Sequence, residues 1–349
     1  MTRVAALDCG TNSLRLLVAD AGPRGELADV VRLMEIVRLG EGVDRTGRLM
    51  PEALGRTFEA LRRYAEIIAA NDAAAVRMVA TSATRDAANA ADFTSGVRSL
   101  LGIEPEVVSG EEEAALSFLG ATADLAATGP PGPYLVVDIG GGSTEFVLGG
   151  AQDSRSGQGL PGGPGSRDGQ GRRSASAGAR IAASASVDIG CVRMTERHLH
   201  SDPPGPGEIA AATSDIDAAL DRVAHEVPDA GEATLIGLAG SVTTLAGIAL
   251  GLQAYDSSAT HHARITAIQV RAVSRQLLGQ TRAQRAAIGV MHPGRVDVIG
   301  AGVLILDRLM ARFGFHDVLV SEHDILDGIA WSLATTPGAA TYGRAATDG

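Results

Sequence analysis

Two segments of the chain carry the same order of apolar and polar positions. Residues 4–19 (VAALDCGTNSLRLLVA) and 135–150 (LVVDIGGGSTEFVLGG) each place Asp-x-Gly-x-x-Ser between two apolar runs. Two short apolar runs joined by a glycine-containing turn predict a β-hairpin. The matched positions are Asp8, Gly10 and Ser13 in the first copy and Asp138, Gly140 and Ser143 in the second. The chain is therefore expected to have two related halves.

Between and after the hairpins, segments with the strand pattern alternate with segments of helical period. Residues 76–80, 106–108 and 318–320 are short apolar runs typical of strands, and residues 234–251 predict a strand, a turn and a helix. Residues 51–70 repeat apolar side chains at helical spacing, on a stripe formed by Leu54, Phe58, Leu61, Ala65 and Ile68. This alternation predicts an α/β fold.

Glycine- and proline-rich stretches suggest the domain boundaries. Residues 129–133 (GPPGP) are the expected hinge. Residues 149–186 are rich in Gly, Ser, Arg and Ala, and about 151–180 is expected to be a disordered hairpin insertion, because it cannot bury enough apolar surface. We therefore predict an N-terminal domain at 1–128, a C-terminal domain at 133–336 and a tail at 337–349.

Composition narrows the class of protein. The chain has 349 residues, 45% of them hydrophobic, and a formal net charge of −11, which argues against nonspecific DNA binding through many basic side chains. No run of about 18 apolar residues predicts a membrane span. The two cysteines lie far apart, which suits a reducing cytoplasm and offers no zinc pattern. We expect a cytoplasmic protein. If it binds an anionic ligand, we expect a local site rather than an extended basic surface.

Three glycine-containing turns follow strands and are candidates for phosphate binding. They cover residues 9–13, 140–144 and 239–241, the last including Gly240 and Ser241. Exposed backbone N–H groups in such turns can hold a phosphate. None matches the P-loop or the dinucleotide fingerprint. Each alone is more often a structural turn, but together they predict a phosphate cleft between the halves.

The segment SGEEEAALSFLG holds a candidate catalytic acid. Ser109 and Glu112 have the spacing of a helix capping box, and Glu111 and Glu112 suit the positive end of the helix dipole. That role does not require Glu113. On a helix, Glu113 shares its face with the small residues Ser117 and Gly120, so its carboxylate could face a cleft.

Charged residues around the turns suggest anion and cation sites. Arg85 follows a strand and could bind a phosphate, or pair with Asp86 or another acid. Asp138 ends a buried strand and Glu145 lies across the turn, a pair that could hold Mg²⁺. Arg15 occupies the position of Glu145 in the first copy. One turn is therefore expected to hold phosphate and the other metal.

The histidines give no clear metal motif. His323-Asp324 is expected to belong to a helix N-terminus with Ser321 as its cap, because no companion cluster of a metal-dependent phosphohydrolase precedes it. The pairs His261-His262 and His292-Pro293 are ambiguous as metal sites. Zinc is not favoured.

Seven segments together resemble the exopolyphosphatase/guanosine pentaphosphate phosphohydrolase (Ppx/GppA) family. In order, they are DCGTNSLRLLVAD, VATSATRDAANA, SGEEEA, DIGGGSTE, SVDIGCVRMTE, GLAGSVTTLAG and HPGRVDVIGAGVLIL, within roughly residues 3–331. The resemblance implies two ribonuclease-H-like α/β domains around a cleft, the fold of the actin, sugar-kinase and heat-shock chaperone superfamily. It agrees with the internal repeat.

The resemblance also implies an activity and roles for residues. It implies hydrolysis of terminal phosphoanhydrides in polyphosphate, or of the 5′ terminal phosphate of guanosine pentaphosphate, and a homodimer. The catalytic glutamate falls on Glu113, and Mg²⁺ is expected near Asp138 and Glu145. The remaining metal and phosphate positions around the cleft are Asp8, Thr11, Asn12, Ser13, Arg85, Gly140, Gly141, Gly142, Ser143 and Thr144.

The substrate stays open at this stage. Longer relatives of this type carry a further helical region that helps to hold long polyphosphate, and these 349 residues include none, so short polyphosphate or a nucleotide is expected. The acidic net charge points the same way. Two alternatives are an ATP-dependent kinase of the same superfamily and a noncatalytic sensor of guanosine tetra- or pentaphosphate.

Overall fold

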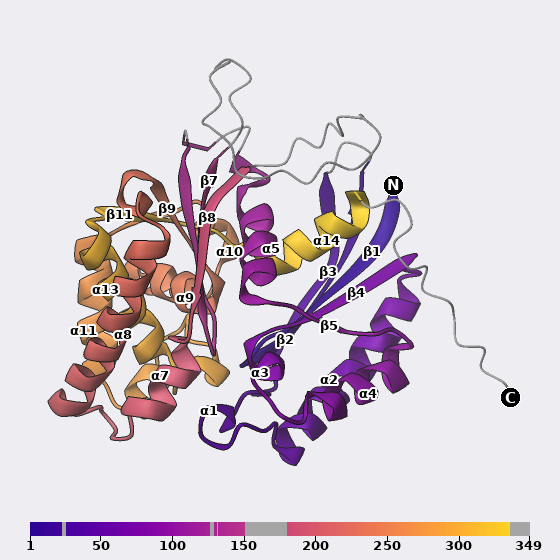
Figure 1. The fold of residues 1–349 in the computed structure, drawn as a ribbon, viewed down its shortest axis with the longest axis horizontal. Helices are drawn as coiled ribbons and strands as arrows, with labels where there is room; N and C mark the ends of the chain where they lie inside the picture. Colours follow the sequence, from indigo (N-terminus) through magenta and orange to yellow (C-terminus); the bar gives the residue numbers. More distant parts are fainter. Residues whose placement is uncertain (23–25, 126–128, 131, 151–179, 336–349) are drawn as a thin grey trace, which may run out of the picture.

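A computed structural model describes residues 1–22, 26–125, 129–130, 132–150 and 180–335 (Figure 1). The expected insertion lies almost entirely outside these residues, and so does the expected tail. Arg180, at the predicted end of the insertion, already belongs to a strand.

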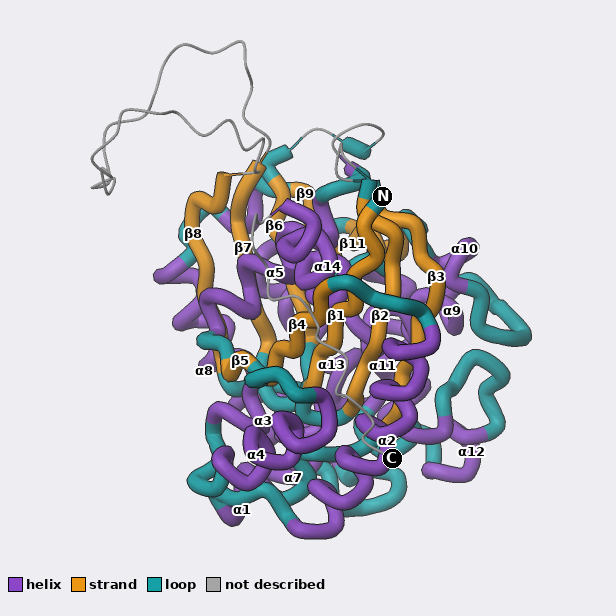
Figure 2. Tube along the Cα trace, turned by 90° about the vertical axis from the view of Figure 1, so that its right-hand side faces the viewer, coloured by secondary structure: helices purple, strands orange, loops and turns teal. Residues whose placement is uncertain are grey.

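The N-terminal half forms a five-stranded mixed sheet, whose strands lie side by side in Figure 2. Its order is β3-β2-β1-β4-β5, antiparallel between β1, β2 and β3 and parallel from β1 to β4 and β5. The strands are β1 (Thr2–Cys9), β2 (Ser13–Ala21), β3 (Leu27–Ile36), β4 (Ala75–Ala80) and β5 (Glu106–Val107). The first predicted hairpin is β1–β2.

The C-terminal half repeats this arrangement in a six-stranded sheet of order β10-β11-β9-β6-β7-β8. Here β6, β7 and β8 are antiparallel, and β9 runs parallel to β6, just as β4 runs parallel to β1. The strands are β6 (Tyr134–Ile139), β7 (Thr144–Gly150), β8 (Arg180–Val187), β9 (Thr234–Leu238), β10 (Arg264–Thr266) and β11 (Asp317–Val320). The structure confirms the internal repeat.

Helices cover the first sheet as the apolar stripe predicts. In α2 (Pro51–Ala70), Leu54, Leu61 and Ile68 are buried, and Phe58 and Ala65 are half-buried against the same core. The remaining helices near this sheet are α1 (Val43–Thr46), α3 (Ser82–Arg85) and α4 (Ala90–Leu101). The strand, turn and helix expected in residues 234–251 are β9 and α9 (Ala239–Ala249).

The largest core lies in the C-terminal half, where helices pack on one another and on the second sheet. These elements are α7 (Cys191–His198), α8 (Pro206–Glu226), α10 (Ser257–Thr260), α11 (Ala267–Gly279), α12 (Arg282–Ala286), α13 (Ile299–Phe313) and two short 3₁₀ turns, Ala230–Glu232 and Pro293–Arg295. Among the helices of the described residues, none is long and apolar enough to cross a membrane.

Two helices cross between the sheets in Figure 1 and do not follow the expected domain division. Helix α5 (Gly110–Thr122) comes from the N-terminal half, yet its Phe118 packs with strands of the second sheet. Helix α14 (Ile325–Thr335) ends the described chain, yet its Ile329 packs on the first sheet. The boundary at residues 129–133 therefore separates the strands but not these helices, because each buries its apolar face on the other half's sheet.

The crossing is close because Gly120 has no side chain. A Cβ at this position would lie 1.9 Å from the carbonyl oxygen of Asp324, at the start of α14. Ser117, on the same face of α5, donates a hydrogen bond from its Oγ to Asp138 at 2.8 Å. The small residues beside Glu113 thus serve helix crossing and carboxylate binding.

Candidate active site

The predicted turns meet in a cleft of about 780 Å³, open solvent included, between the two sheets. Among its lining residues are most of the predicted site: Asp8, Thr11, Asn12, Ser13, Arg15, Glu113, Asp138, Gly140, Gly141, Ser143, Gly240 and Ser241. Residues more than 200 positions apart in the sequence are thereby brought together. Arg85, Gly142, Thr144 and Glu145 do not line this cleft, although Glu145 is buried close behind it.

The two repeated turns have the same backbone bond. The N–H of Gly10 donates to the carbonyl of Ser13 at 3.0 Å, and the N–H of Gly140 donates to that of Ser143 at 3.1 Å. The turns also approach each other, because a Cβ on Gly142 would lie 2.8 Å from Thr11 Oγ1. Glycine in the second turn is therefore required by turn-to-turn packing as well as by any phosphate.

Four acids are buried in or beside the cleft: Asp8, Glu113, Asp138 and Glu145. Burial raises the pKa of Glu113 to about 7, although Arg85 opposes the shift, and burial raises the pKa of Asp138 to about 6. Burial, followed by repulsion from Glu113 and Asp138, raises the pKa of Glu145 well above its usual value. Charged acids at such close quarters require a cation.

The donor set fits a hard divalent ion. Glu145 Oε1 accepts from Ser186 Oγ at 2.9 Å, but its Oε2 is buried without a hydrogen-bond partner in the described chain. The same holds for Oδ1 of Asp8. Buried carboxylate oxygens without donors are costly, and they are the ligands that Mg²⁺ prefers. The residues present therefore fit the metal that the sequence analysis expects.

Arg15 is held by acids from both halves of the molecule. Its guanidinium donates to Asp8 Oδ2 at 2.7 and 2.9 Å and also contacts Asp324. Despite burial, Asp324 and Asp8 raise the pKa of Arg15. In this arrangement its charge is already matched, so it differs from a free phosphate-binding arginine.

Asp324, which the sequence analysis placed at a helix N-terminus but gave no role in the site, caps α14. The N–H of Leu326 donates to Asp324 Oδ1, and the N–H of Asp324 donates to Asp327 Oδ2, both at 2.9 Å. The expected cap, Ser321, instead bonds the backbone of His323. The prediction of Ser321 as the cap was therefore wrong, because the helix begins at Ile325 and Ser321 lies too far ahead of it.

Arg85 pairs with the candidate catalytic acid. Its Nη1 lies 3.1 Å from Glu113 Oε2 and 3.1 Å from the carbonyl of Val108. Of the two roles considered from the sequence, the structure places Arg85 in an ion pair with an acid other than Asp86. Asp86 is bound by Arg193 of α7, in the C-terminal half.

Two predicted phosphate-binding residues have other partners. The buried hydroxyl of Thr144 donates to the carbonyl of Ile189 at 2.8 Å. The carbonyl of Gly142 accepts from Arg193 Nε at 2.7 Å. The Thr144 hydroxyl and the Gly142 carbonyl therefore hold the turn itself, which leaves the backbone N–H groups as the turn's contribution to ligand binding.

Arg295 is a cleft residue that the sequence analysis gave no role. It is half-buried, and its Nη1 donates to Thr244 Oγ1 at 3.1 Å. Within the described residues it forms no ion pair, and burial lowers its pKa. Arg295 lies in the segment HPGRVDVIGAG, which carries part of the family resemblance, but nothing in the local sequence distinguishes it from a surface arginine. An anion in the cleft would match its charge.

Comparisons with known proteins agree with the fold and with the motifs. A model of the Ppx/GppA phosphatase family matches residues 17–336. Exopolyphosphatase 2 of Mycobacterium tuberculosis is 46% identical over 346 residues, which cover 96% of this chain and 99% of that protein. These matches span almost the whole length of both chains.

Solved structures give the same result. The crystal structure of an exopolyphosphatase-like protein is 40% identical with a TM-score of 0.84, and covers 95% of this chain and 99% of its own. A Ppx/GppA family member from Aquifex aeolicus is 28% identical with a TM-score of 0.73, over 95% and 97% of the two chains. The predicted actin-like fold with two related domains is confirmed. This chain belongs to the Ppx/GppA phosphatase family.

Proposed function

We propose that this protein hydrolyses the terminal phosphoanhydride bond of inorganic polyphosphate and releases orthophosphate. The observation that carries the proposal is Glu113, a buried carboxylate with a pKa of about 7, at a cleft formed by both repeated turns. A pKa near the working pH suits a general base. Similarity to exopolyphosphatase 2 supports the same reaction, and neither the kinase nor the sensor is favoured.

In the proposed reaction, water attacks the terminal phosphorus. A bond forms between the water oxygen and phosphorus, the bond from phosphorus to the bridging oxygen breaks, and the shortened chain leaves with the bonding electrons. Glu113 takes the proton from water, while Arg85, 3.1 Å away, fixes the carboxylate. Such proton transfer typically contributes about 10²–10⁴-fold to the rate.

The cleft would hold the phosphate through backbone N–H groups of the two turns and the guanidinium of Arg295. Members of this family typically need a divalent metal ion. We assign Mg²⁺ to Asp138 and Glu145, where it would neutralise charge on the terminal phosphate. The buried, unpartnered Glu145 Oε2 supports this assignment.

Three further proposals rest on the sequence. We expect short polyphosphate to be preferred, with guanosine pentaphosphate as the competing substrate. We also expect a homodimer, by family resemblance, and a cytoplasmic location. Both described cysteines, Cys9 and Cys191, are buried and free, as they would be in a reducing compartment.

The test is phosphate release from short polyphosphate, long polyphosphate, guanosine pentaphosphate and ATP, each with Mg²⁺. Glu113→Gln should lower turnover about 10²–10⁴-fold and leave substrate binding intact. The matched control is Glu111→Gln, an exposed acid in the same helical turn, which should keep full activity. A fully active Glu113→Gln protein would reject the role of Glu113, and ATP-dependent phosphorylation of an acceptor would favour the kinase.

A further inference from the structure

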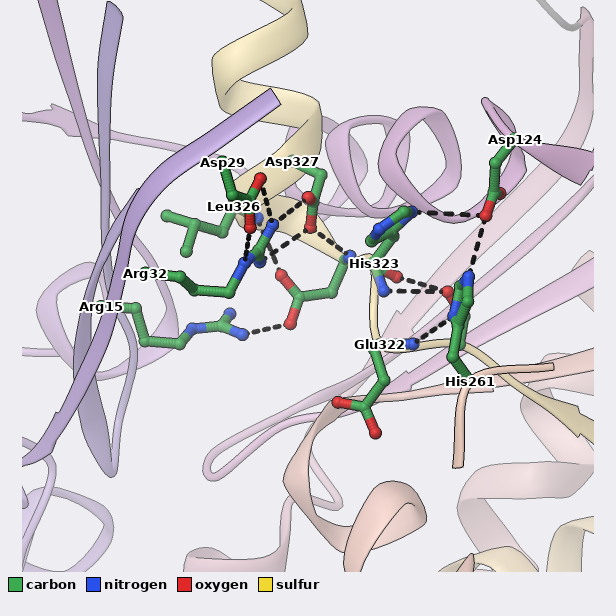
Figure 3. Close-up of polar contacts among 11 residues, drawn as sticks. Arg15, Asp29, Arg32, Asp124, His261, Glu322, His323, Leu326 and Asp327 are labelled. Carbon is green, nitrogen blue, oxygen red and sulfur yellow. Dashed lines mark hydrogen bonds and ion pairs between the residues drawn. The ribbon is translucent and has the colours of Figure 1, made fainter. Parts of the chain in front are cut away.

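Three histidines converge on one carboxylate oxygen outside the cleft. Asp124 Oδ2 lies 3.0 Å from His261 Nε2, 3.3 Å from His262 Nε2 and 3.4 Å from His323 Nδ1. Asp124 follows α5, the His261-His262 pair precedes β10, and His323 precedes α14. Figure 3 shows Asp124, His261 and His323 pointing toward one another from these separate segments. We call these four residues the histidine cluster.

The atoms of the cluster match the ligand set of a transition metal. Zinc binds imidazole nitrogen and carboxylate oxygen at about 2.0–2.2 Å, which places neighbouring ligand atoms of a tetrahedral site about 3.3–3.4 Å apart. Two of the three distances to Asp124 Oδ2 lie at this value or within about 0.1 Å of it, and the third is somewhat shorter. The ligand atoms of Asp124, His261 and His323 all lie within 4.8 Å of one another.

We propose that the histidine cluster binds a divalent transition-metal ion of the zinc type, at a site separate from the oxygen-lined active site. The three ligand atoms come from Asp124, His261 and His323. His262 Nε2 lies 3.3 Å from the same oxygen of Asp124 but is not part of this mutually close set. Imidazole suits zinc, whereas the carboxylates of the cleft suit magnesium. The molecule would thus carry two metal sites of different chemistry.

The packing of two of the rings supports the same interpretation. The rings of His261 and His262 are stacked with centroids 3.8 Å apart, an arrangement that two charged imidazolium groups would oppose.

One contact competes with the metal. The backbone N–H of Glu322 donates to His261 Nδ1 at 3.2 Å, which places the proton of a neutral His261 on Nε2, facing Asp124. Metal binding at Nε2 moves that proton to Nδ1 and gives up the Glu322 contact. We therefore expect binding weaker than that of a preformed structural zinc site.

The position of the cluster gives the metal a structural role. It would join the end of α5 to the segment that enters α14, the two helices that cross between the sheets. The residue after His323 is Asp324, which binds Arg15 in the cleft. Occupancy would therefore fix the relative positions of the crossing helices next to the active site.

Zinc binding by metal-stripped protein tests the proposal. The titration uses ZnCl₂ in mildly alkaline buffer with excess Mg²⁺, so that the cleft carboxylates are occupied. We expect one equivalent to bind per chain, more weakly than at a preformed structural site, and a rise in Tm. Co²⁺ in place of zinc should give the intense visible absorption of a tetrahedral nitrogen and oxygen site.

The double variant His261→Gln/His323→Gln should weaken zinc binding by at least about 100-fold and abolish the Co²⁺ band. The control is His316→Gln, an exposed histidine outside the cluster. Tm without metal shows whether each variant folds. If the double variant does not fold, the single variant His323→Gln provides a second test. Equal zinc affinity in variant and wild type, an octahedral Co²⁺ spectrum, or no binding would overturn the proposal.

Discussion

The two repeated turns have the same backbone and opposite electrostatics. In each hairpin, an acid near the end of the first strand lies opposite a charged residue of the second strand. Asp8 faces Arg15, and Asp138 faces Glu145. The first turn neutralises its acid within the hairpin. The second turn places two acids opposite each other, which is unfavourable without a cation. The two copies thus share the backbone of the turn, and the difference between Arg15 and Glu145 distinguishes their roles.

The largest effect should come from the acidic turn. Asp138→Asn is expected to lower phosphate release about 10²–10³-fold and to raise the Mg²⁺ concentration needed for half-maximal rate, because it removes a proposed metal ligand. The measurement is a Mg²⁺ titration of the rate. Unchanged Mg²⁺ dependence would contradict the division of roles between the turns.

The same substitution in the two turns should change stability in opposite directions. Asp8→Asn should destabilise the metal-free protein by about 3 kcal/mol, because Arg15 loses a partner that it cannot replace by releasing a proton. Burial raises the pKa of Asp8 despite Arg15. The net effect of the substitution should still be destabilising, because the charge of Arg15 persists at neutral pH.

Asp138→Asn should instead stabilise the metal-free protein, because it removes a buried charge near other acids. Urea unfolding at pH 8 in a chelator measures both variants. A shift in the same direction for both would show that the turns do not differ in their charge balance.

A pH series sharpens the comparison further. The pKa of Glu113 rises from 4.5 to about 7 on folding, so the folded protein binds more protons between these values. Its contribution to stability is therefore greatest below about pH 4.5 and is lost as the pH rises toward 7, by about 3 kcal/mol. Tm of the metal-free protein between pH 5 and 8 tests this, and Glu113→Gln should flatten the curve while Glu111→Gln should not.

The smallest expected effect concerns Arg85. Arg85→Gln removes the cation that opposes the raised pKa of Glu113. The pH-rate midpoint should then move upward by about 0.5–1 unit with a modest change in maximal rate. A midpoint that stays in place would show that Arg85 acts on the substrate rather than on Glu113.

Local patterns predicted the elements that depend on local interactions. The spacing of Ser109 and Glu112 predicted the capping box of α5, and both of its hydrogen bonds are present. The apolar stripe predicted α2, and the Asp-x-Gly-x-x-Ser repeat predicted two hairpins with equivalent turns. These features depend on residues a few positions apart, so periodicity and spacing are sufficient to find them.

Contacts between distant segments could not be predicted in this way. Arg15 and Asp324 are 309 residues apart, and the sequence around each gives no sign of the other. The histidine cluster likewise combines one acid and three histidines from three segments, none of which has ligand spacing by itself.

The sequence by itself determined the two related α/β halves, the glycine turns and the choice of Glu113 as the candidate base. Only the tertiary structure decided that α5 packs on the second sheet and α14 on the first. The physical reason is that an apolar helix face specifies burial without specifying a partner. The close approach at Gly120 selects the crossing, and the crossing brings Arg15 to Asp324 and the histidines to Asp124.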